Sequence, residues 1–187
     1  MAVNIFEELV KTYLQAQGYF VMENVSFGLD SKIKIDPKYN TDPSDIDIVA
    51  IKPRSPKEPV LVVSCKGSTK PFDVGEAANQ IMTDGSLWGR DAWRHFRELA
   101  VDEWATALIH RVRHLAGTTN IQHMTAVVSY HGNEIAWREN ETFKRRMGGN
   151  SLKLLSLSQI VNGLKDSNAL PHKSSQATQL IEMFKSA

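Results

Sequence analysis

The chain has 187 residues, and its 22 Lys and Arg against 21 Asp and Glu give a formal net charge of only +1 at pH 7. Hydrophobic residues make up 42% and charged residues 23%, which is typical of a folded globular domain and excludes disordered, collagen-like and disulfide-rich classes. A nearly neutral chain has no overall field that attracts nucleic acid, so any anion binding must come from local clusters of charge.

The cysteine count and the apolar runs bear on where the protein works. Cys65 is the single cysteine, which excludes an internal disulfide and a zinc site built from several thiolates. The first residues lack the basic start and apolar run of a signal peptide, and no stretch approaches the ~20 apolar residues of a membrane span. We therefore expect a cytoplasmic, intracellular protein with no membrane partner.

The first half of the chain is expected to hold one helix and three strands. Apolar residues recur at three- and four-residue spacing over 3–17 and stop at Gly18, which predicts an amphipathic helix. Turn-rich sequence at 31–44 predicts a solvated loop. Segments with strand character lie at 19–28, 46–51 and 59–65. The last two are rich in Val and Ile and are expected to pair in one sheet.

The second half changes to a helical pattern near Asp73. A long helical segment is expected from about Gly89 to Ala116, with a break near Val101 left open. The remaining elements are expected to be a strand at 124–132, a helix at 139–147, a strand at 151–157 and a helix at 158–165. This order predicts one α/β domain over 1–165, with a mixed central sheet flanked by helices on both faces. Residues 166–187 are expected to form a linker and a short helix that packs on the domain or on a partner.

Polar side chains interrupt the two central strands. Asp45 and Asp47 head the first strand, and Ser64, Cys65 and Lys66 end the second. Because side chains alternate along a strand, Ser64 and Lys66 are expected on one face and Cys65 in the opposite, packed layer, where a thiol is inert as a nucleophile. One interpretation is a structural ion pair between Asp47 and Lys66. The other is a metal-dependent hydrolase centre, in which an Asp holds Mg²⁺ and a Lys acts on the attacking water.

Three segments carry a family resemblance: FEELVKTYLQAQGYFV, DIDIVA and LVVSCKG. In this order they resemble the PD-(D/E)XK nuclease superfamily, and most closely its Mrr-like branch, over roughly residues 5–82 and weakly to about 165. The resemblance implies a restriction-endonuclease-like fold and a hydrolase that cleaves DNA with Mg²⁺ or Mn²⁺, in a restriction or defence system.

The resemblance also implies roles for particular residues. Asp47 matches the metal-binding aspartate, Lys66 the motif lysine, and Glu7 a first-helix glutamate that adds to the metal site. Ser64 departs from the pattern because it stands where the family has an acidic residue or Gln, and a hydroxyl cannot replace a carboxylate at a Mg²⁺ site. It is expected to act as an outer hydrogen bonder.

Relatives with an S-x-K motif take the missing carboxylate from the following helix, and Glu76 is the candidate for that position here. Asp73, Gln80 and Asp84 compete with it, and a solvated glutamate at a helix start is an equally weighted interpretation of Glu76. Asp45 is either a second carboxylate near the metal or, in the preferred interpretation, a turn cap after Pro43. The candidate metal positions are Asp47, Glu76 and Glu7, with Cys65 as a fourth.

Clusters of basic residues are the candidate DNA contacts. Three arginines follow i, i+4, i+7 spacing, which would align them on one helix face for successive phosphates, although such stripes are usually only solvated. The candidates are Arg90, Arg94, Arg97, Lys144, Arg145 and Arg146. DNA is the expected partner, together with a second copy or a partner subunit, because cutting both strands demands two active sites. The alternative function is a catalytically inactive nuclease-fold module that binds DNA or a subunit, and Ser64 favours it.

Overall fold

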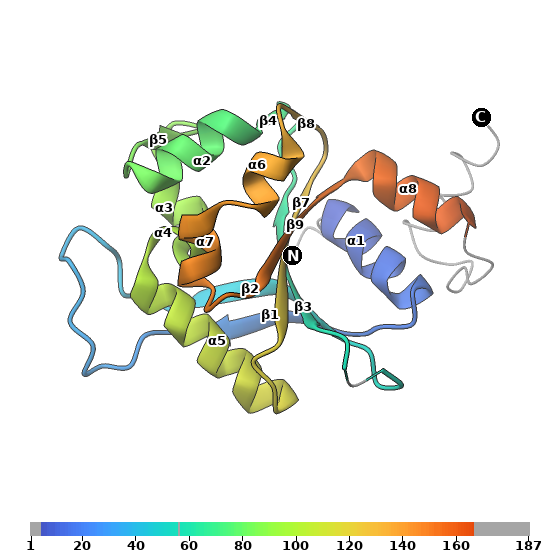
Figure 1. Cartoon of the computed structure of the whole chain (residues 1–187), viewed down its shortest axis with the longest axis horizontal. Helices are drawn as coiled ribbons and strands as arrows, with labels where there is room; N and C mark the ends of the chain where they lie inside the picture. The colour runs from blue at the N-terminus through green and yellow to red at the C-terminus, as the bar shows by residue number, and fades with distance from the viewer. Residues whose placement is uncertain (1–4, 56, 167–187) are drawn as a thin grey trace.

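A five-stranded mixed sheet organises the protein, shown in Figure 1 as a computed structural model that describes residues 5–55 and 57–166. The strand order is β1-β2-β3-β7-β9. The first three strands are antiparallel neighbours, whereas β7 runs parallel to both β3 and β9. The strands are β1 (Phe20–Phe27), β2 (Ser44–Ile51), β3 (Val60–Lys66), β7 (Ile121–Val127) and β9 (Ser151–Ser156).

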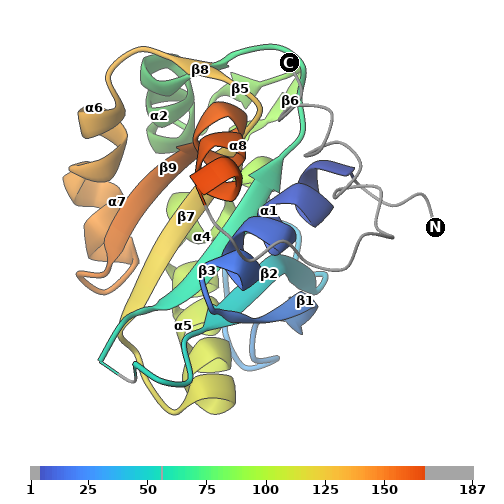
Figure 2. The same ribbon diagram turned by 90° about the vertical axis from the view of Figure 1, so that its right-hand side faces the viewer.

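Helices cover both faces of this sheet, as Figures 1 and 2 show from two directions. One face carries α1 (Ile5–Ala16) and α8 (Leu157–Asp166), which contact each other. The other face carries α2 (Val74–Met82), α3 (Ala92–His95), α4 (Arg97–Ala100), α5 (Asp102–Ala116), α6 (Glu134–Arg138) and α7 (Glu141–Arg146). Two short ladders complete the described elements: β4 (Phe72–Asp73) with β8 (Tyr130–His131), and β5 (Ser86–Leu87) with β6 (Arg90–Asp91). The predicted class, an α/β fold with a mixed sheet between helices, is confirmed.

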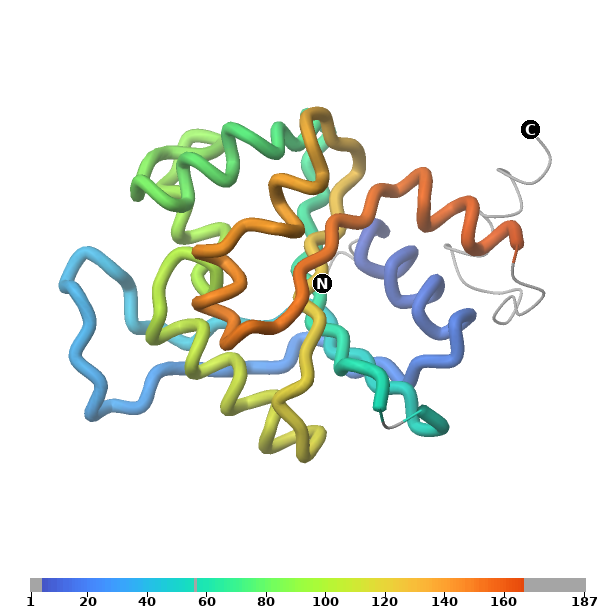
Figure 3. Tube along the Cα trace, in the orientation of Figure 1, coloured from blue at the N-terminus to red at the C-terminus, as the bar shows by residue number. Residues whose placement is uncertain are grey.

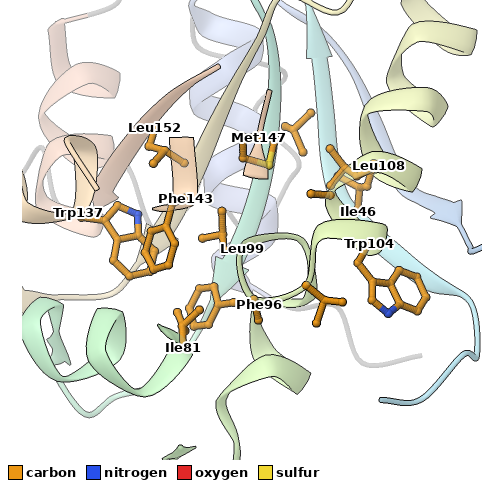
Figure 4. Close-up of a cluster of buried hydrophobic side chains, with 14 of the residues drawn as sticks. Ile46, Ile81, Phe96, Leu99, Trp104, Leu108, Trp137, Phe143, Met147 and Leu152 are labelled. Atoms are coloured by element: carbon orange, nitrogen blue, oxygen red, sulfur yellow. The ribbon is translucent and has the colours of Figure 1, made fainter. Parts of the chain in front are cut away.

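Each face of the sheet has its own apolar core. The smaller core packs α1 and α8 on the sheet through residues such as Val10 and Ile160, both fully buried. The larger core, on the side of α2 to α7, is rich in aromatic rings (Figure 4). There Trp137 makes edge contacts with Phe96 and Phe143, with ring centroids 5.6 and 5.1 Å apart. Burying such rings contributes roughly 1.5–3 kcal/mol each, which fixes the helices over the sheet.

The long helical segment expected from Gly89 to Ala116 is not continuous. The break near Val101 is confirmed, and a second break occurs at Phe96, so the segment forms α3, α4 and α5. The physical reason is burial: Phe96 (φ −142°, ψ 56°) and Val101 (φ −132°, ψ 124°) leave helical geometry, and both side chains are in the larger core. Tertiary packing here overrides the helical pattern of the sequence.

Two other boundaries differ from the prediction. The strand expected at 124–132 begins earlier, at Ile121, and ends at Val127. Helix α6 was not expected; its start is marked by Asn133, whose side chain accepts a 3.0 Å hydrogen bond from the Ile135 N–H. Asn is a preferred N-cap residue, so this signal was present in the sequence.

Residues 28–43 link β1 to β2 as a loop that projects on the side of α3 to α5, and Figure 3 traces its path. Its end is tied to the body because Lys38 and Tyr39 both bind Asp84, at 2.6 and 3.0 Å. The C-terminal helix expected beyond residue 166 lies outside the described residues. Within the described ranges, no helix has the length and apolarity needed to cross a membrane.

Candidate active site

The candidate site lies where β2 and β3 separate. Their antiparallel register runs from the Ala50–Leu61 pair to the Ile48–Val63 pair, and the next position along each strand is Asp47 and Ser64. Beyond this point the Asp47 side chain replaces the ladder: its Oδ2 accepts a 2.6 Å hydrogen bond from the backbone N–H of Cys65. The end of the ladder therefore fixes the position of the Asp47 carboxylate.

A change of face in β2 occurs at Asp47. Ile46 and Val49 pack in the larger core, whereas Ile48 packs in the smaller one, so the strict alternation of a strand is interrupted between residues 46 and 48. In the β1–β2 ladder, Asn24 and Asp47 lie between the Glu23–Ile48 and Val25–Ile46 pairs and are not paired themselves, and Asn24 has a φ of 52°. Asn adopts this left-handed region more readily than most residues. The irregularity therefore involves both strands at the level of Asp47.

Strand β3 keeps the predicted alternation. Cys65 is buried in the smaller core, while Ser64 and Lys66 line a cavity on the other face. The ammonium of Lys66 lies 4.8 Å from the centroid of the Phe96 ring, a cation–π distance. Asp47 and Lys66, both among the described residues, do not form the structural ion pair that one interpretation of the sequence expected.

The cavity has a volume of about 200 Å³ and is bounded by β2, β3, β7 and the α3–α5 segment. Its wall contains both signs of charge. The polar residues that line it are Ser44, Asp45, Asp47, Ser64, Lys66, Arg94, His95, Arg97, Glu98 and His123. Asp45 is part of β2, opposite Ser26, so the preferred interpretation of Asp45 as a turn cap is wrong.

Glu98 and His123 are cavity residues that the sequence analysis missed. Glu98, from α4, is 8% exposed, and His123, from β7, is 0% exposed. His123 Nε2 lies 2.8 Å from Glu98 Oε1. The available signal was an acid within the apolar run around Leu99 and a histidine within an apolar strand, but their pairing depends on contacts 25 residues apart.

Burial affects the acids of the site in different ways. Burial raises the pKa of Asp47, although the Cys65 N–H and the charge of Lys66 oppose the shift, while Glu98 and Asp45 add to it. Burial also acts to raise the pKa of Glu98, but the hydrogen bond and charge of His123, together with Lys66, hold that pKa below its ordinary value. The charge of Lys66 therefore acts to lower the pKa of both carboxylates.

Three predicted metal positions lie away from this cavity. Glu76 is exposed in the first turn of α2 and does not line the cavity. Glu7 lies on α1, which packs on the opposite face of the sheet. The thiol of Cys65 points into that same core, where burial raises its pKa, with smaller contributions from the charges of Asp47 and Glu7. A buried, protonated thiol is a poor ligand for Mg²⁺.

The expected stripe of Arg90, Arg94 and Arg97 on one helix is wrong, because these residues lie on β6, α3 and α4. Arg94 and Arg97 nevertheless both line the cavity. The Arg94 guanidinium stacks 4.7 Å from the Trp93 ring. Arg97 lies 4.9 Å from the Trp104 ring and donates a 2.8 Å hydrogen bond to the Asp42 carbonyl.

The basic run at 144–146 is engaged within the protein. Lys144 pairs with Glu139, and Arg145 and Arg146 both bind Asp102 at 3.2 Å. Arg146 also donates a 2.6 Å hydrogen bond to the Leu99 carbonyl. The run therefore ties α7 to the α4–α5 segment.

The donor set suits a hard cation that takes few of its ligands from the protein. No cluster of three or more His, Cys, Asp or Glu side chains arranged to hold a metal occurs in the described part of the chain. Mg²⁺ commonly uses only one or two protein carboxylates and completes its shell with water and substrate phosphate. Three carboxylates line the cavity, Asp45, Asp47 and Glu98, and they can meet that requirement.

Comparison with protein-family models, with curated proteins and with solved structures found no match to this chain.

Proposed function

We propose that this protein is a Mg²⁺-dependent endonuclease that hydrolyses phosphodiester bonds in DNA. The observation that supports it best is the convergence of Asp47 and Lys66 on one cavity, at the point where their two strands separate. A half-buried carboxylate and a half-buried ammonium that are not joined in an ion pair cost stability, and such groups are common at functional sites.

The site residues divide the work as follows. Asp47, fixed by the Cys65 N–H, would hold the cation. A bound Mg²⁺ would supply Lewis-acid stabilisation of the phosphate charge and lower the pKa of a bound water. The Lys66 ammonium, a donor in the same cavity, orients the attacking water or a phosphate oxygen.

Arg94 and Arg97 are the proposed phosphate contacts. Both line the cavity, and their stacking on Trp93 and Trp104 restrains guanidinium groups whose donors suit phosphate oxygens. Contacts of this kind position a duplex without reading its sequence. Cleavage of both strands would then require two copies of the chain or a partner subunit, in keeping with a restriction or defence role.

Incubation of the purified protein with supercoiled plasmid tests the proposal. We expect nicked and linear products with Mg²⁺ or Mn²⁺ and none with EDTA. The same preparation of the Asp47→Asn variant is the control for a contaminating nuclease. Cleavage that persists in EDTA would contradict the proposal.

A second candidate function is a nuclease-like module that binds DNA without cutting it. Ser64 at the strand position that faces the cavity favours it, because that position carries no charge. An inert wild type that still binds DNA, with every metal tested, would support this alternative.

A further inference from the structure

The Glu98–His123 pair in the cavity wall carries a cost in folding free energy. Both side chains are buried, and their polar atoms are 2.8 Å apart. Removing a carboxylate and an imidazole from water carries a desolvation penalty that an apolar pair of similar size avoids. On the same face of β7, Ile121 and Val127 are apolar and belong to the larger core, while Thr125 is polar and fully buried.

The register places this pair next to the strand position that lacks an acid. His123 lies opposite Val62 of β3, and Thr125 lies opposite Ser64. Positions 62 and 64 share a face, and residues two apart on a strand are separated by only about 6.6 Å. Glu98 is held by His123, and the β3 residue opposite His123 is Val62, two positions from Ser64. Glu98 and Ser64 both line the cavity together with Asp47.

We infer, on the basis of the proposed function, that Glu98 is the second carboxylate of the metal centre and that His123 is the residue that positions it. The Glu98 carboxylate reaches the cavity from α4 and supplies the negative charge that Ser64 does not. His123 holds one oxygen of that carboxylate through Nε2. Hydrogen-bonded partners of this kind orient ligating carboxylates and sustain their metal affinity.

Metal binding tests the role of Glu98 without depending on catalysis. Mn²⁺ alone is titrated calorimetrically into the wild type, Glu98→Gln and the control Glu76→Gln. We expect Glu98→Gln to weaken Mn²⁺ binding about 10- to 100-fold, and we expect Glu76→Gln to bind as the wild type does. Equal Mn²⁺ affinity in wild type and Glu98→Gln, or a wild type that binds no Mn²⁺, would overturn the inference.

Plasmid cleavage by the same proteins separates this inference from the proposed function. A cleaving wild type with an equally active Glu98→Gln would refute the role of Glu98 and leave the nuclease proposal intact. An inert wild type whose Mn²⁺ binding still depends on Glu98 would refute the nuclease proposal and support the metal site. The exchange Ser64→Glu with Glu98→Gln should recover part of the lost Mn²⁺ affinity, because it returns a carboxylate to the same cavity.

Two substitutions of His123 test positioning. His123→Gln keeps an N–H donor for Glu98, whereas His123→Leu removes it. We expect Leu to raise the Mn²⁺ concentration at half-saturation about 10-fold and Gln to restore most of the affinity, with thermal unfolding confirming that both variants are folded. A purely structural pair would shift the unfolding temperature of both variants and leave their Mn²⁺ affinity unchanged.

Discussion

The backbone N–H of Cys65 donates a 2.6 Å hydrogen bond to Oδ2 of Asp47 and joins two strands just where their ladder ends. The contact places a carboxylate at the mouth formed by the diverging strands and leaves the side chain of Cys65 on the opposite face. Asp47 therefore lines the polar cavity, while the side chain of Cys65 packs in the apolar core on the other face of the sheet.

Asp47 should cost the protein stability in the absence of metal. Because its pKa is raised in the folded state, the folded chain binds more proton than the unfolded chain, and the free energy of unfolding falls as pH rises through this window. In EDTA, Asp47→Asn should therefore unfold at a higher temperature than the wild type at pH 8, by about 2–4 °C if the penalty is ~1 kcal/mol. The difference should shrink at pH 4.

Thermal unfolding of both proteins at the two pH values checks this sign. The amide oxygen of Asn can still accept the hydrogen bond from the Cys65 N–H, so the local geometry is retained. A lower unfolding temperature for Asp47→Asn at pH 8 would show that the ionised carboxylate stabilises the fold instead.

Lys66 should matter for the reaction far more than for DNA binding. We expect Lys66→Met, which keeps the length of the stem over Phe96, to lower the cleavage rate by about 10²–10⁴-fold, the usual range for losing a positioned proton donor or acceptor. Single-turnover cleavage and a gel-shift assay in Ca²⁺ would separate the two effects. A matching loss of DNA binding would assign Lys66 to substrate affinity.

The Cys65 thiol should resist modification in the folded protein. It is 9% exposed, and burial raises its pKa, so little thiolate is available to react. We expect slow reaction with a disulfide reagent in buffer and fast reaction in denaturant, with cleavage activity unaffected by the reagent under native conditions. Rapid loss of activity on native labelling would place the thiol nearer the chemistry than the structure does.

Arg94 should contribute affinity that does not depend on DNA sequence. Arg94→Ala should weaken binding to all duplexes and reduce the slope of log K against log salt concentration by about one. Arg113→Ala is the matched control, since Arg113 is an exposed arginine of α5 outside the cavity lining. An unchanged salt slope for Arg94→Ala would exclude a phosphate contact.

Strand periodicity was sufficient to predict the sheet and part of the site. The apolar runs of β2 and β3 predicted buried neighbouring strands, and alternation correctly placed Ser64 and Lys66 on one face. These features depend on local pattern and on pairing between strands that are close in the sequence, so the sequence contained the information.

The helical segment that carries Glu98 was predicted, with a break near Val101 left open, but the break at Phe96 was not. Both side chains turn into the core, and a periodic pattern does not reveal the break at Phe96. Glu76 was the candidate for the relocated carboxylate because the expected helix near Asp73 follows Lys66 directly. The partner of Glu98 is His123, on a strand 25 residues further on, and only tertiary structure brings the two together.

The most direct test of the central claim is Mg²⁺-dependent plasmid cleavage by wild type and Asp47→Asn, purified identically and compared at equal DNA occupancy in Ca²⁺. We predict that the wild type cuts the plasmid, that EDTA stops it, and that Asp47→Asn binds DNA equally well but has lost at least about 10²-fold of the cleavage rate, as expected for removal of a metal ligand. Cleavage by Asp47→Asn at the wild-type rate would contradict the account, because it would place the chemistry outside the cavity between β2 and β3.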